Sequence, residues 1–234
     1  MKSLAPVLCT LVVVGAIGVV PPLALAAHRS SASIAGGSAH RRSLCVHYRC
    51  ITLTADAQVR VFQARNRRRS EGAFRSTFAL WLRSGRVTAF GDSAEIGGTA
   101  LEALALSGPF VAYALGGAER SAGAGRGEAV YRLDAGSGRR SQISCGGGSE
   151  RTCCIAANAP GVTDVATTSS GSVAWIVGGV RSLTQPFAVF LFAAHASNPV
   201  QLTASADISP HSLAAISGHV YWLEGEAAHQ MPAE

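Results

Sequence analysis

The sequence predicts an all-β protein built from a repeated unit of about four short strands. Three observations favour this fold class. Of the 234 residues, 48% are hydrophobic, only 15% are charged and 26 are glycine, a composition that suits short strands and turns better than long charged helices. Short apolar runs recur between turn signals. A Ser-Gly turn followed by an aromatic-bearing strand returns several times along the chain.

The first 26 residues have the features of a secretory signal peptide. Lys2 supplies a positive charge, an apolar stretch runs from Val7 to Val20, and Ala24-Leu25-Ala26 is a small-x-small cleavage site. The alternative is an uncleaved membrane anchor, but Pro21-Pro22 interrupts the segment, whose apolar part is short for a span of about 20 residues. We therefore expect an exported protein, extracellular or at the cell surface, with no membrane span after cleavage.

The mature chain is expected to begin with a linker and continue as one repeat domain. Residues 27–43 consist mainly of Ser, Ala, Gly, His and Arg, which predicts a flexible linker. Residues 44–234 contain the apolar runs and are predicted to form the repeat domain.

The repeated unit is clearest around its Ser-Gly turns, each of which leads into a short apolar strand with an aromatic residue. The copies are Leu106–Gly116, Ser169–Gly178, Ile216–Gly225 and a fainter first copy, Ala57–Phe62. The aromatic positions that they align are Phe62, Tyr113, Trp175 and Trp222. Further strands are expected before the Ser-Gly turns, at 101–106, 162–167 and 213–216, and after the aromatic strands, at 78–82, 129–133 and 188–192. A turn and a polar outer strand, such as 139–143 or 200–203, complete the unit.

Four short strands in roughly 40 to 50 residues are typical of a β-propeller blade. Over about residues 50–226, this pattern of strands and turns resembles the secreted bacterial β-propeller repeat proteins of the broad TolB-like and YVTN-like group. The resemblance implies a propeller-like fold with about four blades of four-stranded antiparallel meander. A two-sheet β-sandwich is the alternative, because strand periodicity does not distinguish the two folds.

The last unit is expected to be incomplete, with two strands only, because Glu226–Glu234 is short and polar. Residues Leu44–Leu53 could return to supply a missing strand and close a four-bladed ring. Alternatively, the chain is a fragment of a longer propeller, or a second chain completes the unit. Open strand edges promote association, so self-association through the last unit is one expected outcome.

Five cysteines remain once the signal, which contains Cys9, is removed. An oxidising compartment favours disulfides. The candidate local pairs are Cys45 with Cys50, and Cys145 with Cys153 or Cys154. Cys45-Val-His47-Tyr-Arg-Cys50 also suggests a zinc site, but no second matched ligand pair accompanies it. We therefore expect structural disulfides with one thiol left over, and neither a metal nor another cofactor.

One motif suggests catalysis. Phe90-Gly91-Asp92-Ser93 resembles the nucleophile block of the GDS-type (SGNH) hydrolases, which implies a secreted esterase with Ser93 as its nucleophile. The Gly-x-Asn block of that family is missing, and Asp207 and His211 are one residue too far apart for its Asp-x-x-His pair. A Gly-Asp-Ser turn between two units is therefore the expected structure.

Positive charge is concentrated in the first unit. Residues 41–86 contain 11 arginines against two acidic residues, whereas residues 87–234 contain 7 arginines against 12 acidic residues. The densest run provides the candidate polyanion-binding residues Arg65, Arg67, Arg68 and Arg69, in a predicted loop. Exposed guanidinium groups bind sulfate, phosphate or carboxylate, although such a run is often only a solvated loop. No nucleic-acid module accompanies it, so the expected partner is a protein or an anionic cell-surface polymer, not nucleic acid.

Together these patterns predict an exported, non-catalytic binding scaffold that contacts its ligand through the loops between strands. The alternatives are the esterase that uses Ser93 and a structural or assembly module completed by a partner chain.

Overall fold

The computed structural model describes residues 45–66, 75–93, 99–117, 128–144, 161–178 and 186–234. All of them belong to a compact unit, Ala35–Glu234, while a separate unit comprises Met1–Ile34. The predicted signal peptide at 1–26 and linker at 27–43 lie outside the described residues.

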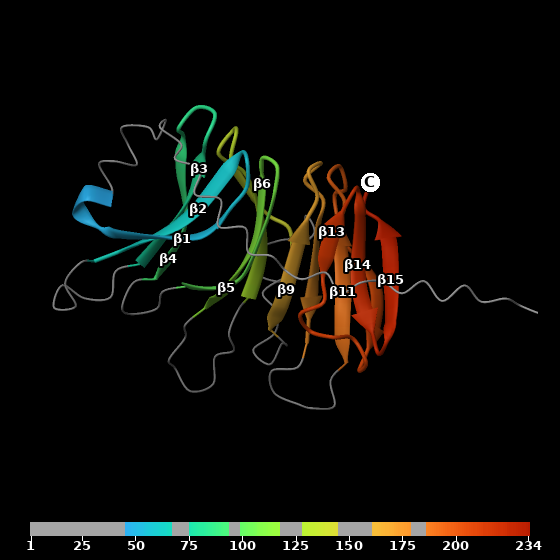
Figure 1. Cartoon of the computed structure of the whole chain (residues 1–234). Helices are drawn as coiled ribbons and strands as arrows, with labels where there is room; N and C mark the ends of the chain where they lie inside the picture. The colour runs from blue at the N-terminus through green and yellow to red at the C-terminus, as the bar shows by residue number, and fades with distance from the viewer. Residues whose placement is uncertain (1–44, 67–74, 94–98, 118–127, 145–160, 179–185) are drawn as a thin grey trace, which may run out of the picture. The chain divides into compact units, whose positions relative to one another are not determined.

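The described chain forms four antiparallel sheets, in which every strand pairs with its neighbours in sequence (Figure 1). Sheet 1 contains β1 (Arg49–Ala55), β2 (Val59–Arg65), β3 (Arg75–Trp81) and β4 (Val87–Ser93). Sheet 2 contains β5 (Thr99–Ser107), β6 (Phe110–Gly117), β7 (Glu128–Asp134) and β8 (Arg139–Gln142). Sheet 3 contains β9 (Val162–Thr167), β10 (Val173–Val177), β11 (Phe187–Phe192) and β12 (Val200–Ser205). Sheet 4 contains β13 (Ala214–Ile216), β14 (His219–Glu224) and β15 (Ala227–Pro232).

The all-β fold and its repeated antiparallel meander are confirmed, but three details of the prediction are wrong. β1 pairs with β2, so Arg49–Leu53 belongs to sheet 1 and does not supply the missing strand of the last unit, which was one of the alternatives considered. β15 pairs with β14 along its whole length, which gives sheet 4 a third strand where none was expected. Gly91-Asp92-Ser93 lies in β4, paired with β3, and is not a turn.

An aromatic pair across the second and third strands marks the repeat in every sheet. Phe62, Tyr113, Trp175 and Trp222 all lie on second strands and are buried. Each stacks on the ring directly opposite it, with ring centroids 5.3 to 5.6 Å apart. The pairs are Phe62–Phe78, Tyr113–Tyr131, Trp175–Phe190 and Trp222–His229. Cross-strand aromatic pairs stabilise a sheet and fix its register.

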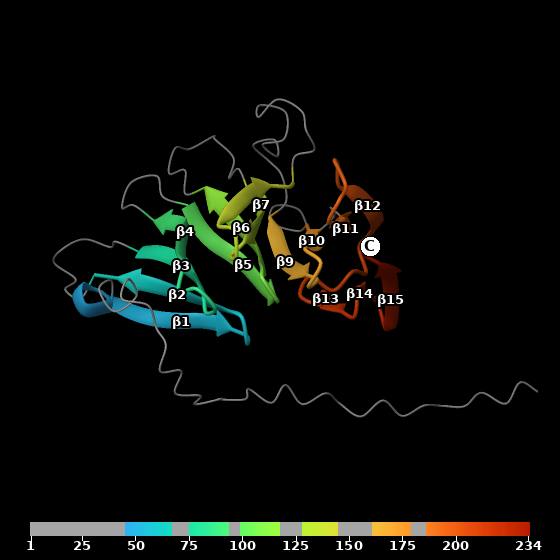
Figure 2. The same ribbon diagram turned by 90° about the horizontal axis from the view of Figure 1, so that it is seen from above.

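Figure 2 shows the four sheets side by side in chain order. Among the described residues, three hydrophobic cores join consecutive sheets. In the first, Val59 and Val61 of sheet 1 pack with Tyr113 of sheet 2. The second places Ala112 and Ala114 of sheet 2 against Trp175 of sheet 3, and the third places Ala174 and Ile176 of sheet 3 against Trp222 of sheet 4. The aromatic pair of sheets 2, 3 and 4 therefore faces the preceding sheet.

Because neighbouring strands run in opposite directions, each sheet has two ends. At one end, called the turn end, tight turns join the first strand of a sheet to the second and the third strand to the fourth. The opposite end of each sheet, where the second strand ends and the third begins, is called the link end. Within the described ranges, no helix has the length and hydrophobicity needed to cross a membrane.

Candidate functional site

The turns at the turn end are fixed by their own side chains. In the turn between β1 and β2, Asp56 Oδ1 accepts hydrogen bonds from the backbone N–H groups of Gln58 and Val59, both at 2.7 Å. In the turn between β7 and β8, Asp134 Oδ1 accepts from the N–H groups of Gly136 and Ser137 at 2.9 and 3.2 Å. Carboxylate oxygens that accept backbone N–H bonds hold such turns in one conformation.

Hydrogen bonds also join the turn ends of neighbouring sheets. Arg132 of sheet 2 donates through Nη1 to the carbonyl oxygens of Gly171 and Ala194 in sheet 3, at 2.9 and 3.2 Å. Ser172 of sheet 3 donates to the carbonyl oxygen of Ala233, which follows β15. These bonds fix the position of each turn relative to the turns of the next sheet.

Four exposed arginines lie in the β3–β4 turn or at the start of β8, at the turn end of sheets 1 and 2, and they are called the arginine cluster. Its members are Arg83, Arg86, Arg139 and Arg140. Arg86 Nη1 donates to the carbonyl oxygen of Gly136 at 2.7 Å, which joins the β3–β4 turn to the β7–β8 turn. A Cβ atom on Gly138 would lie 3.6 Å from the same nitrogen, so Arg86 also lies close to the residue that precedes Arg139.

Aromatic rings hold one member of the cluster in place. The guanidinium carbon of Arg140 lies 4.2 Å from the ring centroid of Tyr131 and 5.9 Å from that of Tyr113. Cation–π attraction of this kind is worth roughly 0.5 to 1 kcal/mol at an exposed site. The Arg140 side chain is thus ordered while its guanidinium group stays accessible.

The electrostatic surroundings of the cluster are positive. Burial lowers the pKa of Arg132, and the positive charge of Arg139 lowers it further, while Asp134 acts in the opposite direction. The Asp134 carboxylate is engaged by its turn, through the two N–H groups and through the Ser137 hydroxyl at 2.7 Å. The cluster can therefore attract an anion from solution.

Of the predicted polyanion-binding residues, Arg65 alone lies within the described ranges. Arg65 ends β2 at the link end of sheet 1, where its Nε donates to Gln63 Oε1 at 2.6 Å. Arg67, Arg68 and Arg69 lie outside the described residues. The arginine cluster, at the opposite end, was missed because its members come from two turns about fifty residues apart. The adjacent pair Arg139-Arg140 was the only local signal for it.

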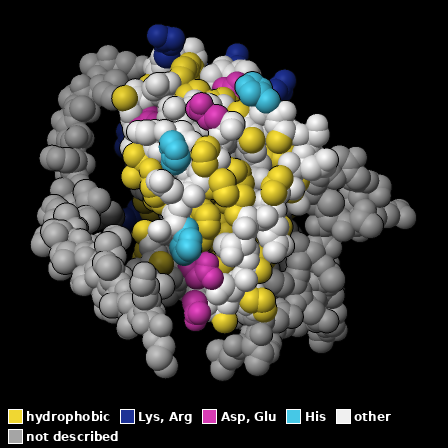
Figure 3. Space-filling view, turned by 90° about the vertical axis from the view of Figure 1, so that its right-hand side faces the viewer, with side chains coloured by type: hydrophobic (Ala, Val, Ile, Leu, Met, Phe, Trp, Pro, Cys, Tyr) yellow, Lys and Arg dark blue, Asp and Glu magenta, His cyan; other side chains and the backbone are white. Residues whose placement is uncertain are grey.

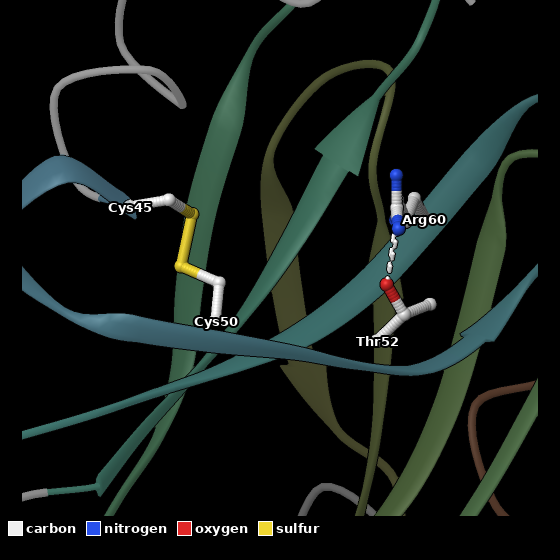
Figure 4. The surroundings of a disulfide bond; sticks show 4 residues. All are labelled: Cys45, Cys50, Thr52 and Arg60. Atoms are coloured by element: carbon white, nitrogen blue, oxygen red, sulfur yellow. Dashed lines mark hydrogen bonds between the residues drawn. A yellow bond between two sulfur atoms is a disulfide. The ribbon is translucent and has the colours of Figure 1, made fainter. Parts of the chain in front are cut away.

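The predicted disulfide between Cys45 and Cys50 is present, with Cα atoms 5.5 Å apart (Figure 4). The two sulfurs are bonded to each other, so they do not form the zinc site considered for this motif. Cys145, Cys153 and Cys154 lie outside the described residues. A disulfide fits an exported protein, because such bonds persist in oxidising compartments.

The residues proposed for an esterase are distributed over different sheets. Ser93 ends β4 in sheet 1, paired with Arg75. Asp207 and His211 lie in the connection between β12 and β13, which joins sheets 3 and 4. The charge of His211 acts there on Asp164 of β9. Among the described residues, no group of three or more His, Cys, Asp or Glu side chains is arranged to hold a metal ion.

No protein-family model and no curated protein matches the chain. The candidate site therefore stands on its own geometry.

Proposed function

We propose that the protein is an exported, propeller-like binding scaffold that holds an anionic polymer against the arginine cluster. One observation carries this proposal. Four exposed arginines lie in or beside turns of sheets 1 and 2, and these turns are hydrogen-bonded within and between the two sheets. The hydrogen bond of Arg86 to Gly136 and the contact of Arg140 with the Tyr131 ring restrict these two side chains, so they lose less conformational entropy when a ligand binds.

The chemistry of arginine points to the ligand class. A guanidinium group presents a planar fork of donors that matches the oxygens of sulfate, phosphate or carboxylate. Each exposed charge pair contributes only about 0.2 to 1 kcal/mol, so a single small anion would bind weakly. A polymer that carries several such groups can engage two or more arginines at once, and its binding energies then accumulate.

The scaffold supports this function because its sheets are arranged as a series of similar units. Sheets 2, 3 and 4 each pack their aromatic pair on the preceding sheet, as blades of a propeller do, and their tight turns lie at one end. Loops on a rigid scaffold are common binding surfaces.

Binding of a sulfated polysaccharide, heparin, tests the proposal. The dissociation constant is measured by isothermal titration calorimetry at several sodium chloride concentrations. Arg83→Gln combined with Arg139→Gln removes two charges from the cluster. Arg49→Gln combined with Arg65→Gln is the matched control, because it also removes two charges, from residues paired on β1 and β2 at the link end.

We expect the double variant to bind roughly fivefold or more weakly, because two exposed charge pairs are lost. Its affinity should also depend less steeply on salt, since fewer counterions are exchanged. The control should bind as the parent protein does. Equal losses in the two variants would show that heparin responds to net charge alone and would overturn the proposed site.

A further inference from the structure

One tryptophan lies at the arginine cluster. Trp81 ends β3 and leads into the β3–β4 turn, where its carbonyl oxygen accepts a hydrogen bond from the Gly85 N–H and its own N–H donates to the carbonyl oxygen of Arg86, both at 2.8 Å. Trp81 is half-buried, because it packs against the hydrophobic core that sheets 1 and 2 share. A tryptophan that is partly open to solvent therefore begins the turn that carries Arg83 and Arg86.

The indole of Trp81 also reaches the neighbouring sheet. Trp81 pairs with Val59, so both side chains lie on the face of sheet 1 that packs on sheet 2. A Cβ atom added to Gly136 would lie 3.8 and 3.9 Å from the indole atoms Cε2 and Cζ2. The carbonyl oxygen of Gly136 is also the acceptor for Arg86 Nη1. Trp81 thus lies at the seam between the β3–β4 turn and the β7–β8 turn, and each of these turns carries or precedes arginines of the cluster.

Trp81 differs in exposure from the other two tryptophans of the chain. Trp175 and Trp222 are 3% and 5% exposed and belong to the second and third hydrophobic cores. Trp81 is therefore the tryptophan that a ligand can reach. Tryptophan and arginine are both enriched among the residues that contribute most to binding. An accessible indole among four guanidinium groups fits a ligand that has an apolar surface as well as negative charge.

We propose that the anionic polymer is a polysaccharide and that one of its sugar rings packs flat on the Trp81 indole. This inference rests on the proposed function, because it names the ligand of the same site. A sugar ring has an apolar face of C–H groups, which excludes water when it packs on an aromatic ring. Its sulfate or carboxylate substituents lie at the edge of the ring, where guanidinium groups can bind them. A polyphosphate has the charge but no such face.

Nucleic acid is the rival ligand, because its bases can also stack on an indole. The disulfide at the start of β1 favours the polysaccharide, since disulfides are typical of exported proteins, which meet the polysaccharides of cell surfaces. Single-stranded DNA is therefore included in the experiment.

Binding of three polymers separates charge from stacking. Heparin, linear polyphosphate and single-stranded oligothymidylate are titrated into the full mature chain by isothermal titration calorimetry at several sodium chloride concentrations. Trp81→Leu removes the aromatic ring, and Trp81→Phe keeps a smaller one. Circular dichroism checks that each variant is folded.

Tyr221→Leu is the matched control, because it removes a half-buried aromatic residue of sheet 4, far along the chain from the cluster. Residues 182–234 contain no lysine or arginine. Figure 3 views the molecule from the side of sheet 4 and shows histidines and carboxylates on its surface, with Lys and Arg at the margins. An anionic polymer is therefore not expected to bind at Tyr221.

We expect Trp81→Leu to bind heparin roughly fivefold or more weakly, because less apolar surface is buried, and to bind polyphosphate as the parent does. The loss should be the same at every salt concentration, since burial of apolar surface is not screened as charges are. The loss in Arg83→Gln with Arg139→Gln should instead shrink as salt is added. Trp81→Phe should bind heparin within about twofold of the parent, because it keeps an aromatic face, and Tyr221→Leu should bind as the parent does.

Tryptophan fluorescence of the parent protein tests the contact without any substitution. Because Trp175 and Trp222 are buried, a change in emission on binding reports on Trp81. Heparin should shift the emission to shorter wavelength and reduce its quenching by acrylamide, whereas polyphosphate should do neither.

Equal losses of affinity for heparin and polyphosphate in Trp81→Leu, or heparin binding without a change in emission, would overturn the sugar contact. Oligothymidylate that binds more tightly than heparin, with the same dependence on Trp81, would assign the site to nucleic acid instead. If Arg83→Gln with Arg139→Gln weakens binding of none of the polymers, the proposed function itself fails. A loss in that variant without one in Trp81→Leu would refute the sugar contact alone.

Discussion

Tyr113 has the largest fully buried side chain among the described residues, and its buried hydroxyl group is unsatisfied. Its hydroxyl has no hydrogen-bond partner within the described ranges, and burial raises its pKa. A buried hydroxyl without a partner costs about 1 to 3 kcal/mol, while the ring packs against Phe90 and Tyr131. We expect Tyr113→Phe to leave the free energy of unfolding unchanged or to raise it by about 1 kcal/mol in urea denaturation. A loss above 1 kcal/mol would mean that the hydroxyl is hydrogen-bonded.

Gly171 is required by both conformation and space. Its φ is +92°, and an added Cβ would lie 2.9 Å from the Phe110 ring. Left-handed backbone costs other residues roughly 1 to 2 kcal/mol, and the ring must also move, so Gly171→Ala should destabilise the protein by about 2 kcal/mol or more. Gly225→Ala is the control, since its φ is +60° and the added atom meets nothing within 4 Å. In thermal unfolding, the melting temperature should fall less in Gly225→Ala than in Gly171→Ala. Equal falls in melting temperature would exclude a role for Phe110.

Asp164 links stability to pH. Burial raises its pKa, although the N–H groups of Leu213 and Val165 and the charge of His211 partly offset the shift. The folded protein therefore binds this proton more tightly than the unfolded chain does. The resulting stabilisation is complete below the unfolded pKa of about 4 and is lost as the pH rises through the folded value.

Comparison with Asp164→Asn isolates this effect. The N–H of Val165 donates to Oδ1 at 2.9 Å and that of Leu213 to Oδ2 at 3.0 Å, so the single amide oxygen of asparagine can keep only one of these hydrogen bonds. That loss is the same at every pH, and the amide does not titrate, so the pH dependence of the difference between the two proteins isolates the titration of Asp164. We expect the parent protein to gain stability relative to the variant as the pH falls from 7 to below 4, in urea denaturation at each pH. A parent that loses stability relative to the variant over this range would contradict the direction of the shift.

At the scale of elements, the disulfide fixes the beginning of β1. Closing a loop of this length removes unfolded-chain entropy worth about 2 kcal/mol in the chain-entropy model. We expect Cys45→Ser with Cys50→Ser to increase hydrogen exchange at the start of β1, and to leave exchange in sheets 3 and 4 unchanged. Increased exchange throughout the chain would show instead that the disulfide-linked start of β1 is needed for the whole fold.

The elements predicted well were those with strong local patterns. Residues 162–167 form β9 as predicted, because a run of apolar and β-branched residues there precedes a Ser-Gly turn whose glycine has positive φ. β15 was missed because Ala227–Pro232 lacks β-branched residues, and its strand conformation depends on pairing with β14. The aromatic positions on the second strands were predicted from the repeat. The partner ring of each one is set by the register between the second and third strands, which cannot be derived from the sequence.

The candidate site was less predictable than the fold. Arg65 and its neighbours were selected because they are consecutive in sequence, which is a local property. The arginine cluster depends on Arg86 of one sheet meeting Gly136 of the next. Such a meeting follows from the packing of sheets 1 and 2, so no spacing along the chain reveals it.

At the scale of the whole molecule, stability is expected to resemble that of a repeat array. The three hydrophobic cores each join one sheet to the next, so each sheet is stabilised mainly by its neighbours. Ile216 and Leu223 of sheet 4 are exposed, which fits an open series of sheets, since closure through that side of sheet 4 would bury them. Removal of an end sheet should then affect one core only.

Deletion of residues 206–234 tests whether the series is open. The deletion removes sheet 4 and the bond between Ser172 and Ala233, but it leaves the two cores that join sheets 1, 2 and 3. We expect the shortened chain to keep its β-sheet circular dichroism and to unfold cooperatively at a lower temperature than the full chain. It should also bind a hydrophobic dye, because Ile176 and Leu191 lose their cover. In a closed ring the same deletion would disrupt two interfaces at once, so loss of all ordered structure would argue for closure.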